Sequence, residues 1–221
     1  MSNATSCSAW RLYVIVDPAA ARGRDLAQIA AQAIRGGADA IQLRDKTDPV
    51  RQVIEQAERL LAVTRPAAVP LIINDRIDVA VACGADGVHV GQDDLPVSVA
   101  RQLLGPDRII GKSTHTLPQA LEAEREGVDY LAVGPIYPTP TKPDSRSVGR
   151  ELIAQVRAKI RSPLVVIGGI EEGTLPAVLQ AGAVCVAVVR SVCGADDPEG
   201  AARTLKRMLT QFGREGVQSD L

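Results

Sequence analysis

The chain has 221 residues, of which 46% are hydrophobic and 2% aromatic, and its formal net charge is −1. This length suits one (β/α)8 barrel, whose lower limit is about 200 residues, although two small domains would also fit. The near-zero charge and the scarcity of aromatic residues exclude a general attraction to nucleic acids or membranes and a platform on which bases could stack.

Eight short runs rich in β-branched and aliphatic residues predict strands. Each run is almost entirely apolar, which is typical of parallel strands buried on both faces. Segments with apolar residues three or four positions apart, such as 25–37, 50–63 and 117–127, follow them and predict helices. Asp196, Asp197 and Pro198 predict a cap for the last helix. The predicted strands are 12–17, 40–45, 70–75, 87–92, 108–113, 130–135, 164–169 and 184–189.

A weak internal repeat accompanies these elements. A glycine-led triplet precedes four of the apolar runs, and glycine just after a helix can adopt the left-handed conformation that ends it. Four βαβα units give eight strands, so we expect a single (β/α)8 TIM-barrel domain over residues 1–221. An open doubly wound sheet is the alternative, but eight evenly spaced units leave little room for its usual additions. The triplets are Gly37-Ala38-Asp39, Gly84-Ala85-Asp86, Gly127-Val128-Asp129 and Gly182-Ala183-Val184.

Both ends of the chain are polar. Residues 1–10 lack the apolar core of a signal peptide and are expected to form a tail, and residues 213–221 are expected to fray. No apolar run has the length of a membrane helix. The four cysteines lack zinc spacing and are expected to be small buried hydrophobes in a reducing compartment. We therefore expect a cytoplasmic protein, and the sequence leaves its oligomeric state open.

Active sites of such barrels lie at the carboxyl ends of the strands, so the polar residues that end each apolar run are the candidates. Gln42, Arg44 and Lys46 alternate along the second run and are expected to point the same way. An amide and two cations at the barrel mouth suit a multiply charged phosphate ester. The alternative is a solvated strand end with salt bridges to its neighbours.

The third and fourth runs end in carboxylates. Asn74 and Asp75 end one run, and Asp94 follows the next. Because these strands are neighbours in a barrel, Asp75 and Asp94 can converge, and paired carboxylates with phosphate oxygens and water commonly hold Mg²⁺. The alternative is helix capping, because both residues precede predicted helices. Beside Arg44 and Lys46, the metal interpretation is favoured.

The fifth run ends in Ser113, Thr114 and His115. The Ser113 hydroxyl can bond a phosphate oxygen or cap the following helix, and nothing in the sequence marks His115 as an acid or base. His89 lies in the middle of the fourth run, where a histidine of the core is the favoured interpretation.

The last three strand ends predict a second anion site. After the sixth run, three prolines stiffen a loop that carries Thr139, Pro140, Thr141 and Lys142, which suits a clamp over an anion. Gly168-Gly169 ends the seventh run and Val189-Arg190 the eighth, where barrels frequently bind phosphate through backbone amides. Two anion sites indicate two phosphorylated small molecules, or one with phosphate at both ends.

These motifs together resemble the thiamine phosphate synthase family. The matching segments occur in family order and cover most of the chain. They are GGADAIQLRDK (36–46), INDRIDVAVACGADGVHVGQDDLP (73–96), GKSTHT (111–116), DYLAVGPIYPTPTK (129–142), VIGGI (166–170) and GADDP (194–198).

The resemblance implies a transferase that joins 4-amino-5-hydroxymethyl-2-methylpyrimidine diphosphate to a thiazole phosphate, giving thiamine phosphate and pyrophosphate. It implies Mg²⁺ as the cofactor, held by Asp75 and Asp94. The residues implied for the pyrimidine diphosphate are Gln42, Leu43, Arg44, Asp45, Lys46, Asn74, Ser113 and Lys142; Arg44, Lys46, Ser113 and Lys142 among them are expected to take part in catalysis. Those implied for the thiazole phosphate are Thr139, Pro140, Thr141, Gly169, Val189 and Arg190.

The implied chemistry is dissociative. Pyrophosphate leaves a benzylic-type carbon on an electron-rich ring, so the site must neutralise the departing charge and keep water away from the cation. Arg190 stands where the family has serine, which leaves only the backbone part of that phosphate site as expected. A thiazole tautomerase on the same barrel and a non-catalytic barrel that binds a phosphorylated ligand are the rivals, and neither requires Asp75, Asp94 and Lys46 together.

Overall fold

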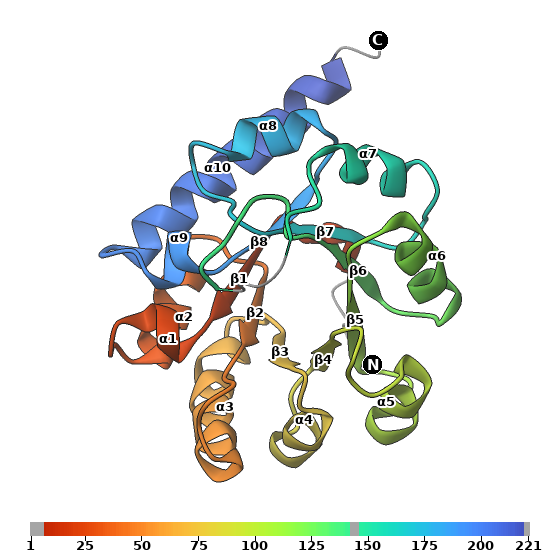
Figure 1. Ribbon diagram of the computed structural model, residues 1–221. Helices are drawn as coiled ribbons and strands as arrows, with labels where there is room; N and C mark the ends of the chain where they lie inside the picture. The colour runs from red at the N-terminus through yellow and green to blue at the C-terminus, as the bar shows by residue number, and fades with distance from the viewer. Residues whose placement is uncertain (1–6, 142–145, 219–221) are drawn as a thin grey trace.

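The computed structural model describes residues 7–141 and 146–218, with side chains as far as Gly213. Eight parallel strands close into a barrel in chain order, with β8 paired to β1 (Figure 1). This closure confirms the (β/α)8 barrel and excludes the open sheet. The strands are β1 Leu12–Val16, β2 Ala40–Leu43, β3 Leu71–Asn74, β4 Gly87–Val90, β5 Ile109–Thr114, β6 Tyr130–Val133, β7 Leu164–Ile167 and β8 Cys185–Val188.

Helices surround the barrel and cover its outer face (Figure 1). The predicted helices 25–37, 50–63 and 117–127 correspond to α2, α3 and α6, and the predicted cap is present, because Asp197 accepts the Gly200 amide. The helical segments are η1 Cys7–Ala9, α1 Pro18–Ala21, α2 Leu26–Arg35, α3 Val50–Thr64, α4 Ile77–Cys83, α5 Val97–Leu104, α6 Leu117–Arg125, α7 Glu151–Arg157, α8 Leu175–Gln180, α9 Arg190–Cys193 and α10 Pro198–Gln218.

The strands separate two cores. Side chains such as Val14 and Val16 of β1 pack outward against the helices, whereas Tyr13 and Ile15 of the same strand belong to a second cluster inside the barrel. Successive side chains of a strand point to opposite faces, and here both faces are buried in an apolar core. The strand sequences are therefore apolar throughout, without alternation.

The four-fold repeat has a physical basis at the amino ends of the strands. Gly37, Gly84, Gly127 and Gly182 all have positive φ, between 68° and 101°, as the repeat predicted. The aspartates that follow three of these glycines then tie neighbouring strands together. Their Oδ2 atoms accept amide hydrogens at 2.7 to 2.9 Å, from Leu12 to Asp39, from Leu71 to Asp86 and from Ile110 to Asp129.

The two ends of the chain differ from the sequence prediction. Cys7 to Trp10 do not form a tail, because the Trp10 ring is 1% exposed and packs on Tyr13 and Tyr130 inside the barrel. The helix α10 continues to Gln218, so residues 213–218 are helical where fraying was predicted.

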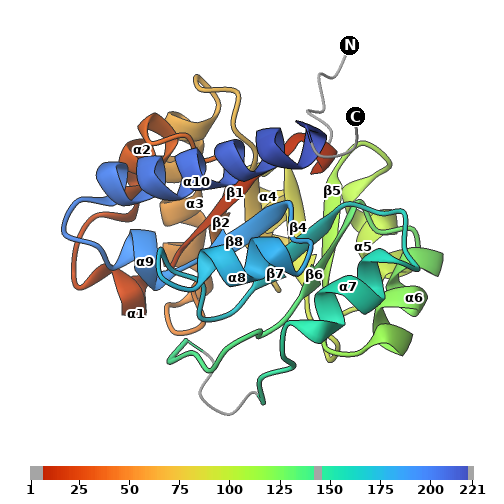
Figure 2. The same ribbon diagram turned by 90° about the horizontal axis from the view of Figure 1, so that it is seen from above.

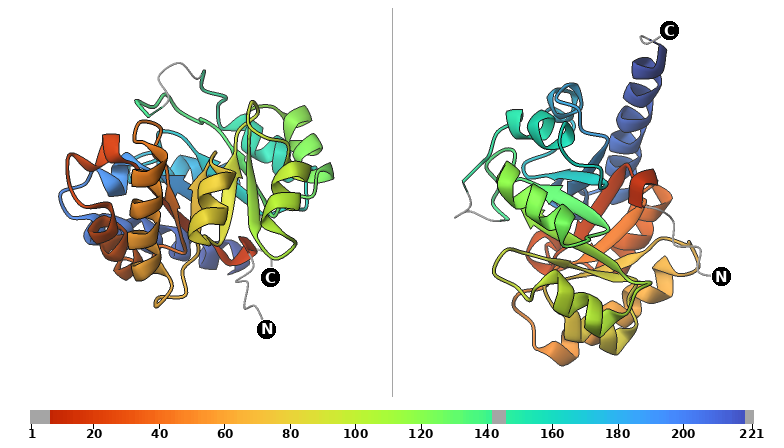
Figure 3. Two further views of the ribbon diagram at one scale, coloured as in Figure 1. Left: turned by 90° about the horizontal axis from the view of Figure 1, so that it is seen from below. Right: turned by 90° about the vertical axis from the view of Figure 1, so that its right-hand side faces the viewer.

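The loop that follows β6 lies at one end of the barrel, and η1 lies at the opposite end with the last turns of α10 (Figure 2). Figure 3 shows the same arrangement from two other sides. No described helix is both long and apolar enough to cross a membrane.

Candidate active site

A cavity of about 390 Å³ opens at the carboxyl ends of the strands. Its deep walls are apolar and come from inward-facing strand residues such as Ile15, Ala132 and Val165, and its polar groups stand at the strand ends. Ten of the residues predicted from the sequence line it. They are Gln42, Arg44, Asn74, Ser113, Thr139, Pro140, Thr141, Gly169, Val189 and Arg190.

Arg44 is a mostly buried cation at the edge of the cavity. Its Nη1 donates to Asp17 Oδ2 at 2.5 Å, and the two side chains are only 15% and 5% exposed. Asp17 also caps α1 by accepting the Ala19 amide, so the carboxylate is held in place by the chain itself. The Nε atom of Arg44 is buried and has no partner in the described structure. Arg44 therefore lies against the cavity with a fixed orientation and an unused donor.

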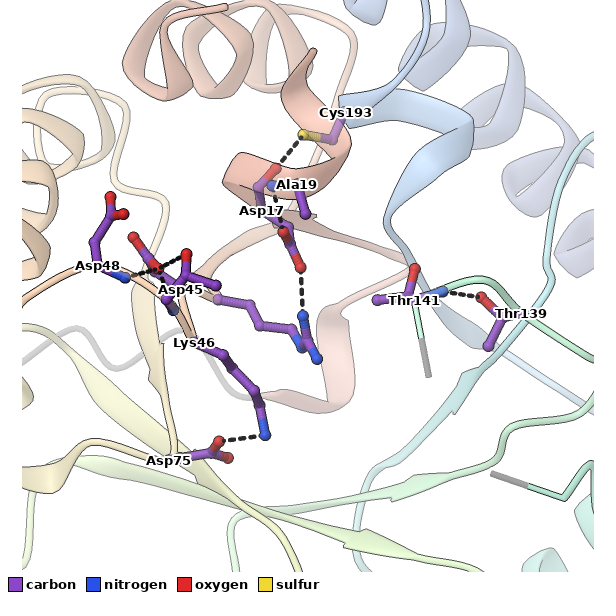
Figure 4. Close-up of polar contacts among 11 residues, drawn as sticks. Asp17, Ala19, Asp45, Lys46, Asp48, Asp75, Thr139, Thr141 and Cys193 are labelled. Atoms are coloured by element: carbon purple, nitrogen blue, oxygen red, sulfur yellow. Dashed lines mark hydrogen bonds and ion pairs between the residues drawn. The ribbon is translucent and has the colours of Figure 1, made fainter. Parts of the chain in front are cut away.

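Lys46 reaches from the loop after β2 to the end of β3. Its Nζ lies 2.9 Å from Asp75 Oδ2, and half of the side chain is exposed (Figure 4). Lys46 stands at the rim and does not line the cavity. Two residues beside it turn away: Leu43 is buried in the outer core, and Asp45 accepts the amides of Thr47 and Asp48. The Leu43 and Asp45 side chains are thus placed to support the loop.

Asp75 and Asp94 converge at the same rim. Neither caps a helix, because Arg76 precedes α4 and Pro96 precedes α5 without a side-chain cap. The Asp94 Oδ2 atom accepts the Gly91 amide at 2.6 Å. Burial raises the pKa of Asp94, and the neighbouring Asp75 carboxylate raises it further.

The backbone conformation of Asp75 is consistent with the prediction that Asp75 and Asp94 are ligands of a cation. Its φ is 60°, a left-handed conformation that is uncommon outside glycine and often marks a functional position. Among the described side chains, no group of three or more His, Cys, Asp or Glu could hold a metal. A cation here would therefore take the two carboxylates together with oxygens from water or a bound phosphate, which is the usual environment of Mg²⁺.

The floor of the cavity carries a chain of hydrogen bonds between five strands. Gln42 Nε2 donates to the Tyr13 hydroxyl at 2.7 Å, and that hydroxyl lies 3.0 Å from the Tyr130 hydroxyl. Tyr130 lies 2.9 Å from His89 Nδ1, and His89 Nε2 lies 2.9 Å from Ser113 Oγ. Sequence reasoning missed Tyr13 and His89 as residues of the site, since both lie within apolar runs that read as core.

His115 also lines the cavity, from the end of β5. Its Nδ1 lies 2.5 Å from the carbonyl oxygen of Gly134, which can only accept. The neutral ring therefore carries its proton on Nδ1 and leaves Nε2 as an acceptor. Ser113 does not cap α6, because Thr116 holds that position.

The loop after β6 forms the far wall. Thr139 and Thr141 lie across the opening from Lys46 and Asp75, and the Thr141 amide donates to Thr139 Oγ1 at 3.3 Å (Figure 4). Lys142, the cation predicted for this loop, lies outside the described residues. Gly169 has a φ of 63°, and a Cβ atom there would approach Tyr137 Cβ at 2.7 Å. Glycine is thus required for the loop to pack against the end of β7.

The end of β8 completes the wall. Ser191 Oγ donates to the Ile170 carbonyl at 3.1 Å and so joins the loops after β7 and β8. Arg190 lines the cavity with an exposed side chain, where the sequence resemblance led us to expect serine. The site therefore has an acidic and basic rim at β2 to β4 and a second polar wall at β6 to β8, separated by an apolar interior.

Comparisons with known proteins identify the family of this chain. The sequence model of the thiamine monophosphate synthase family matches residues 12–192. A thiamine-phosphate synthase of Chloroflexus aurantiacus is 48% identical over 202 residues, covering 91% of this chain and 93% of that protein. One from Roseiflexus castenholzii is 49% identical over 201 residues, covering 90% and 88%.

Solved structures give the same result. Thiamine phosphate pyrophosphorylase from Pyrococcus furiosus superposes with a TM-score of 0.85 at 36% identity, covering 93% of this chain and 98% of that one. A geranylgeranylglyceryl phosphate synthase from Thermoplasma acidophilum, at 17% identity and a TM-score of 0.71, shows the shared fold alone. The family model over residues 12–192 and relatives 48% and 49% identical over about nine tenths of the chain show that this chain belongs to the thiamine monophosphate synthase family.

Proposed function

We propose that the enzyme joins 4-amino-5-hydroxymethyl-2-methylpyrimidine diphosphate to a thiazole phosphate and releases thiamine phosphate and pyrophosphate. The carbon–oxygen bond to the diphosphate breaks first, and the thiazole nitrogen then captures the pyrimidine methylene cation that is left. The thiazole nitrogen is already nucleophilic, so the reaction requires no covalent catalyst from the protein.

The charged rim is suited to the leaving diphosphate. Arg44 lines the cavity with a mostly buried guanidinium held by Asp17, and Lys46 offers an ammonium group at the rim. Fixed cations that face the departing oxygens stabilise the charge that develops there, and they do so more strongly in a site that excludes water. Asn74 also lines the cavity and is proposed to contact the pyrimidine diphosphate, and Ser113 is proposed to face its pyrimidine ring. Lys142 is proposed as a further cation from the loop after β6.

The carboxylates fit a divalent cation. Asp75 and Asp94 would hold Mg²⁺, whose remaining ligands would be water and diphosphate oxygens. When bound, Mg²⁺ supplies positive charge to the leaving group. Lys46 then keeps the Asp75 carboxylate oriented, and the Gly91 amide does the same for Asp94.

The second wall suits the phosphate of the thiazole. Thr139 and Thr141 offer hydroxyl groups on a loop stiffened by Pro138 and Pro140, and this loop lies against Gly169. We place the thiazole phosphate between these threonines, Gly169 and the Val189-Arg190 segment. Arg190 adds a guanidinium that can pair with the phosphate in place of a serine hydroxyl.

The observation that carries the proposal is the convergence of Asp75, Asp94 and Lys46 beside Arg44, at the edge of a cavity with a second polar wall. The test is pyrophosphate release by the purified protein with Mg²⁺ and both substrates, each omitted in turn. We expect release only when both substrates and Mg²⁺ are present. Release that does not require the thiazole phosphate would indicate hydrolysis instead and contradict the proposal.

A further inference from the structure

The Gln42 end of the hydrogen-bond chain at the cavity floor has a fixed donor, and one direction follows if each later hydroxyl donates to the next member. The Gln42 amide nitrogen can only donate, so the Tyr13 oxygen accepts from it. Either hydroxyl could donate across the 3.0 Å between Tyr13 and Tyr130, and we assign Tyr13 as the donor because Gln42 already donates to its oxygen. The proton of Tyr130 is thereby directed to His89 Nδ1.

The same direction continues through the imidazole. A neutral histidine whose Nδ1 accepts carries its proton on Nε2, so His89 donates to Ser113 Oγ. The chain therefore begins at Gln42, whose Oε1 is left as an acceptor, and ends at Ser113, whose own proton is left as a donor. Both end residues line the cavity.

We propose that Tyr13, Tyr130 and His89 are positioning residues that fix this acceptor-and-donor pattern and so select the ring that Gln42 and Ser113 bind. The inference rests on the proposed function. A 4-aminopyrimidine offers an amino donor beside a ring-nitrogen acceptor, which complements Gln42 Oε1 and the Ser113 hydroxyl. The 4-oxo analogue presents the reverse pattern, a carbonyl acceptor beside a ring N–H donor.

The packing holds the middle of the chain rigid. Tyr130 is fully buried and does not line the cavity, so it can influence a ligand only through its neighbours. Its ring stacks on His89, and its hydroxyl end occupies space left by Gly111, where a Cβ atom would lie 2.4 Å from the oxygen. Burial raises the pKa of Tyr13 and Tyr130, so both hydroxyls keep their protons at neutral pH.

The tautomer of His89 is a direct test on the ligand-free protein. The sequence holds two histidines, so a long-range ¹H–¹⁵N NMR spectrum contains two imidazoles, which a His115→Gln variant assigns. We expect His89 protonated on Nε2 and His115 protonated on Nδ1, because His115 Nδ1 donates to the Gly134 carbonyl. His89 protonated on Nδ1 would overturn the proposal.

A Tyr130→Phe variant tests the consequence for specificity. It keeps the buried ring but removes the link between Tyr13 and His89. We expect the preference for the 4-amino over the 4-oxo pyrimidine diphosphate, measured as the ratio of kcat/KM values, to fall about tenfold, the scale of one well-placed hydrogen bond. The KM for the thiazole phosphate should not change. The His89 tautomer should become mixed.

Matched variants complete the design. Tyr137→Phe makes the same chemical change outside the chain and should leave both the preference and the tautomer as in the wild type. Tyr13→Phe breaks the hydrogen-bond chain one link earlier and should also lower the preference for the 4-amino substrate. This second variant keeps the test valid if Tyr130→Phe does not fold. An unchanged preference and tautomer in both chain variants would overturn the proposal. Absence of thiamine phosphate formation in the wild type would instead refute the proposed function, while the tautomer measurement would still test the chain.

Discussion

At the scale of single residues, the two rim carboxylates depend on different partners. Asp75 is paired with Lys46 and lies in a left-handed backbone conformation, whereas Asp94 is held by a backbone amide and has no cation as its main partner. Asp94 is therefore the carboxylate whose negative charge is less balanced by a neighbouring cation. Substitution of Asp94 therefore tests the proposed metal site while leaving the Lys46–Asp75 ion pair in place.

The Asp94→Asn variant should lose most Mg²⁺-dependent turnover, by about 100-fold at limiting Mg²⁺, because a carboxylate ligand is removed while an oxygen remains to accept the Gly91 amide. The melting temperature without metal should hardly change. Asp93→Asn, at the exposed neighbouring position, is the matched control and should keep its turnover. Equal activity of the two variants across an Mg²⁺ titration would refute the metal assignment.

Asp17 and Arg44 form a second residue pair whose loss has a defined cost. An Asp17→Asn variant keeps an acceptor for the Ala19 amide but leaves the Arg44 guanidinium without its counter-charge in a mostly buried place. We expect the free energy of unfolding to fall by about 3 kcal/mol, measured by urea denaturation.

Added pyrophosphate should restore part of that stability, because an anion in the cavity supplies the missing charge. The gain from pyrophosphate should be larger in the variant than in the wild type. Equal gains would show that the anion does not reach Arg44.

At the scale of elements, the repeated aspartates explain why the barrel can be read from the sequence. Each of Asp39, Asp86 and Asp129 exchanges two hydrogen bonds with the strand before it, one through its backbone amide and one through its side chain. The fourth position holds Val184, whose side chain cannot accept a hydrogen bond and which is 38% exposed. The repeated aspartate in the sequence therefore marks the same pair of hydrogen bonds between neighbouring strands at three places in the barrel.

An Asp86→Ala variant should lower the free energy of unfolding by about 1–2 kcal/mol, because the Leu71 amide loses its acceptor. Asp86→Asn retains a side-chain oxygen and should lose less. Urea denaturation of the two variants checks the order. A larger decrease in the free energy of unfolding for Asp86→Asn than for Asp86→Ala would contradict the stabilising role of the Leu71–Asp86 hydrogen bond.

The strands and helices were predictable because the hydrophobic pattern of each βα unit is contained within its own stretch of sequence. The strands, the helices and most residues of the cavity wall follow from apolar runs and the polar groups that end them. The pairing of Asp17 with Arg44 was not predictable, since it depends on the register between β1 and β2 after closure. Tyr13 and His89 were missed because inward-facing residues of a barrel look the same in sequence whether they fill the core or line a site.

At the scale of the whole molecule, the interior of the barrel makes stability sensitive to high pH. Burial raises the pKa of the Cys185 thiol and of the Tyr13 and Tyr130 hydroxyls. The unfolded chain releases these protons near the ordinary values of 9.0 for cysteine and 10.0 for tyrosine, while the folded chain retains them. Since the native state then binds more protons, the free energy of unfolding decreases as pH rises.

We therefore expect stability to be constant near neutral pH and to fall above about pH 9, by up to about 1.4 kcal/mol per pH unit for each such group. Urea denaturation from pH 7 to 10.5 measures the slope. Cys185→Ala removes one group and should make the slope shallower, whatever its effect on stability at pH 7. A slope that is unchanged in this variant would show that Cys185 does not retain its proton.

We propose that one cavity couples departure of a diphosphate to capture by a thiazole. A ³¹P NMR time course of the protein with Mg²⁺ and both substrates tests this most directly, because every phosphorus species is seen at once. We predict that the pyrimidine diphosphate signals decay while pyrophosphate and thiamine phosphate appear in equal amounts. Conversion of the thiazole phosphate to another monoester without pyrophosphate would contradict the account and identify an isomerase.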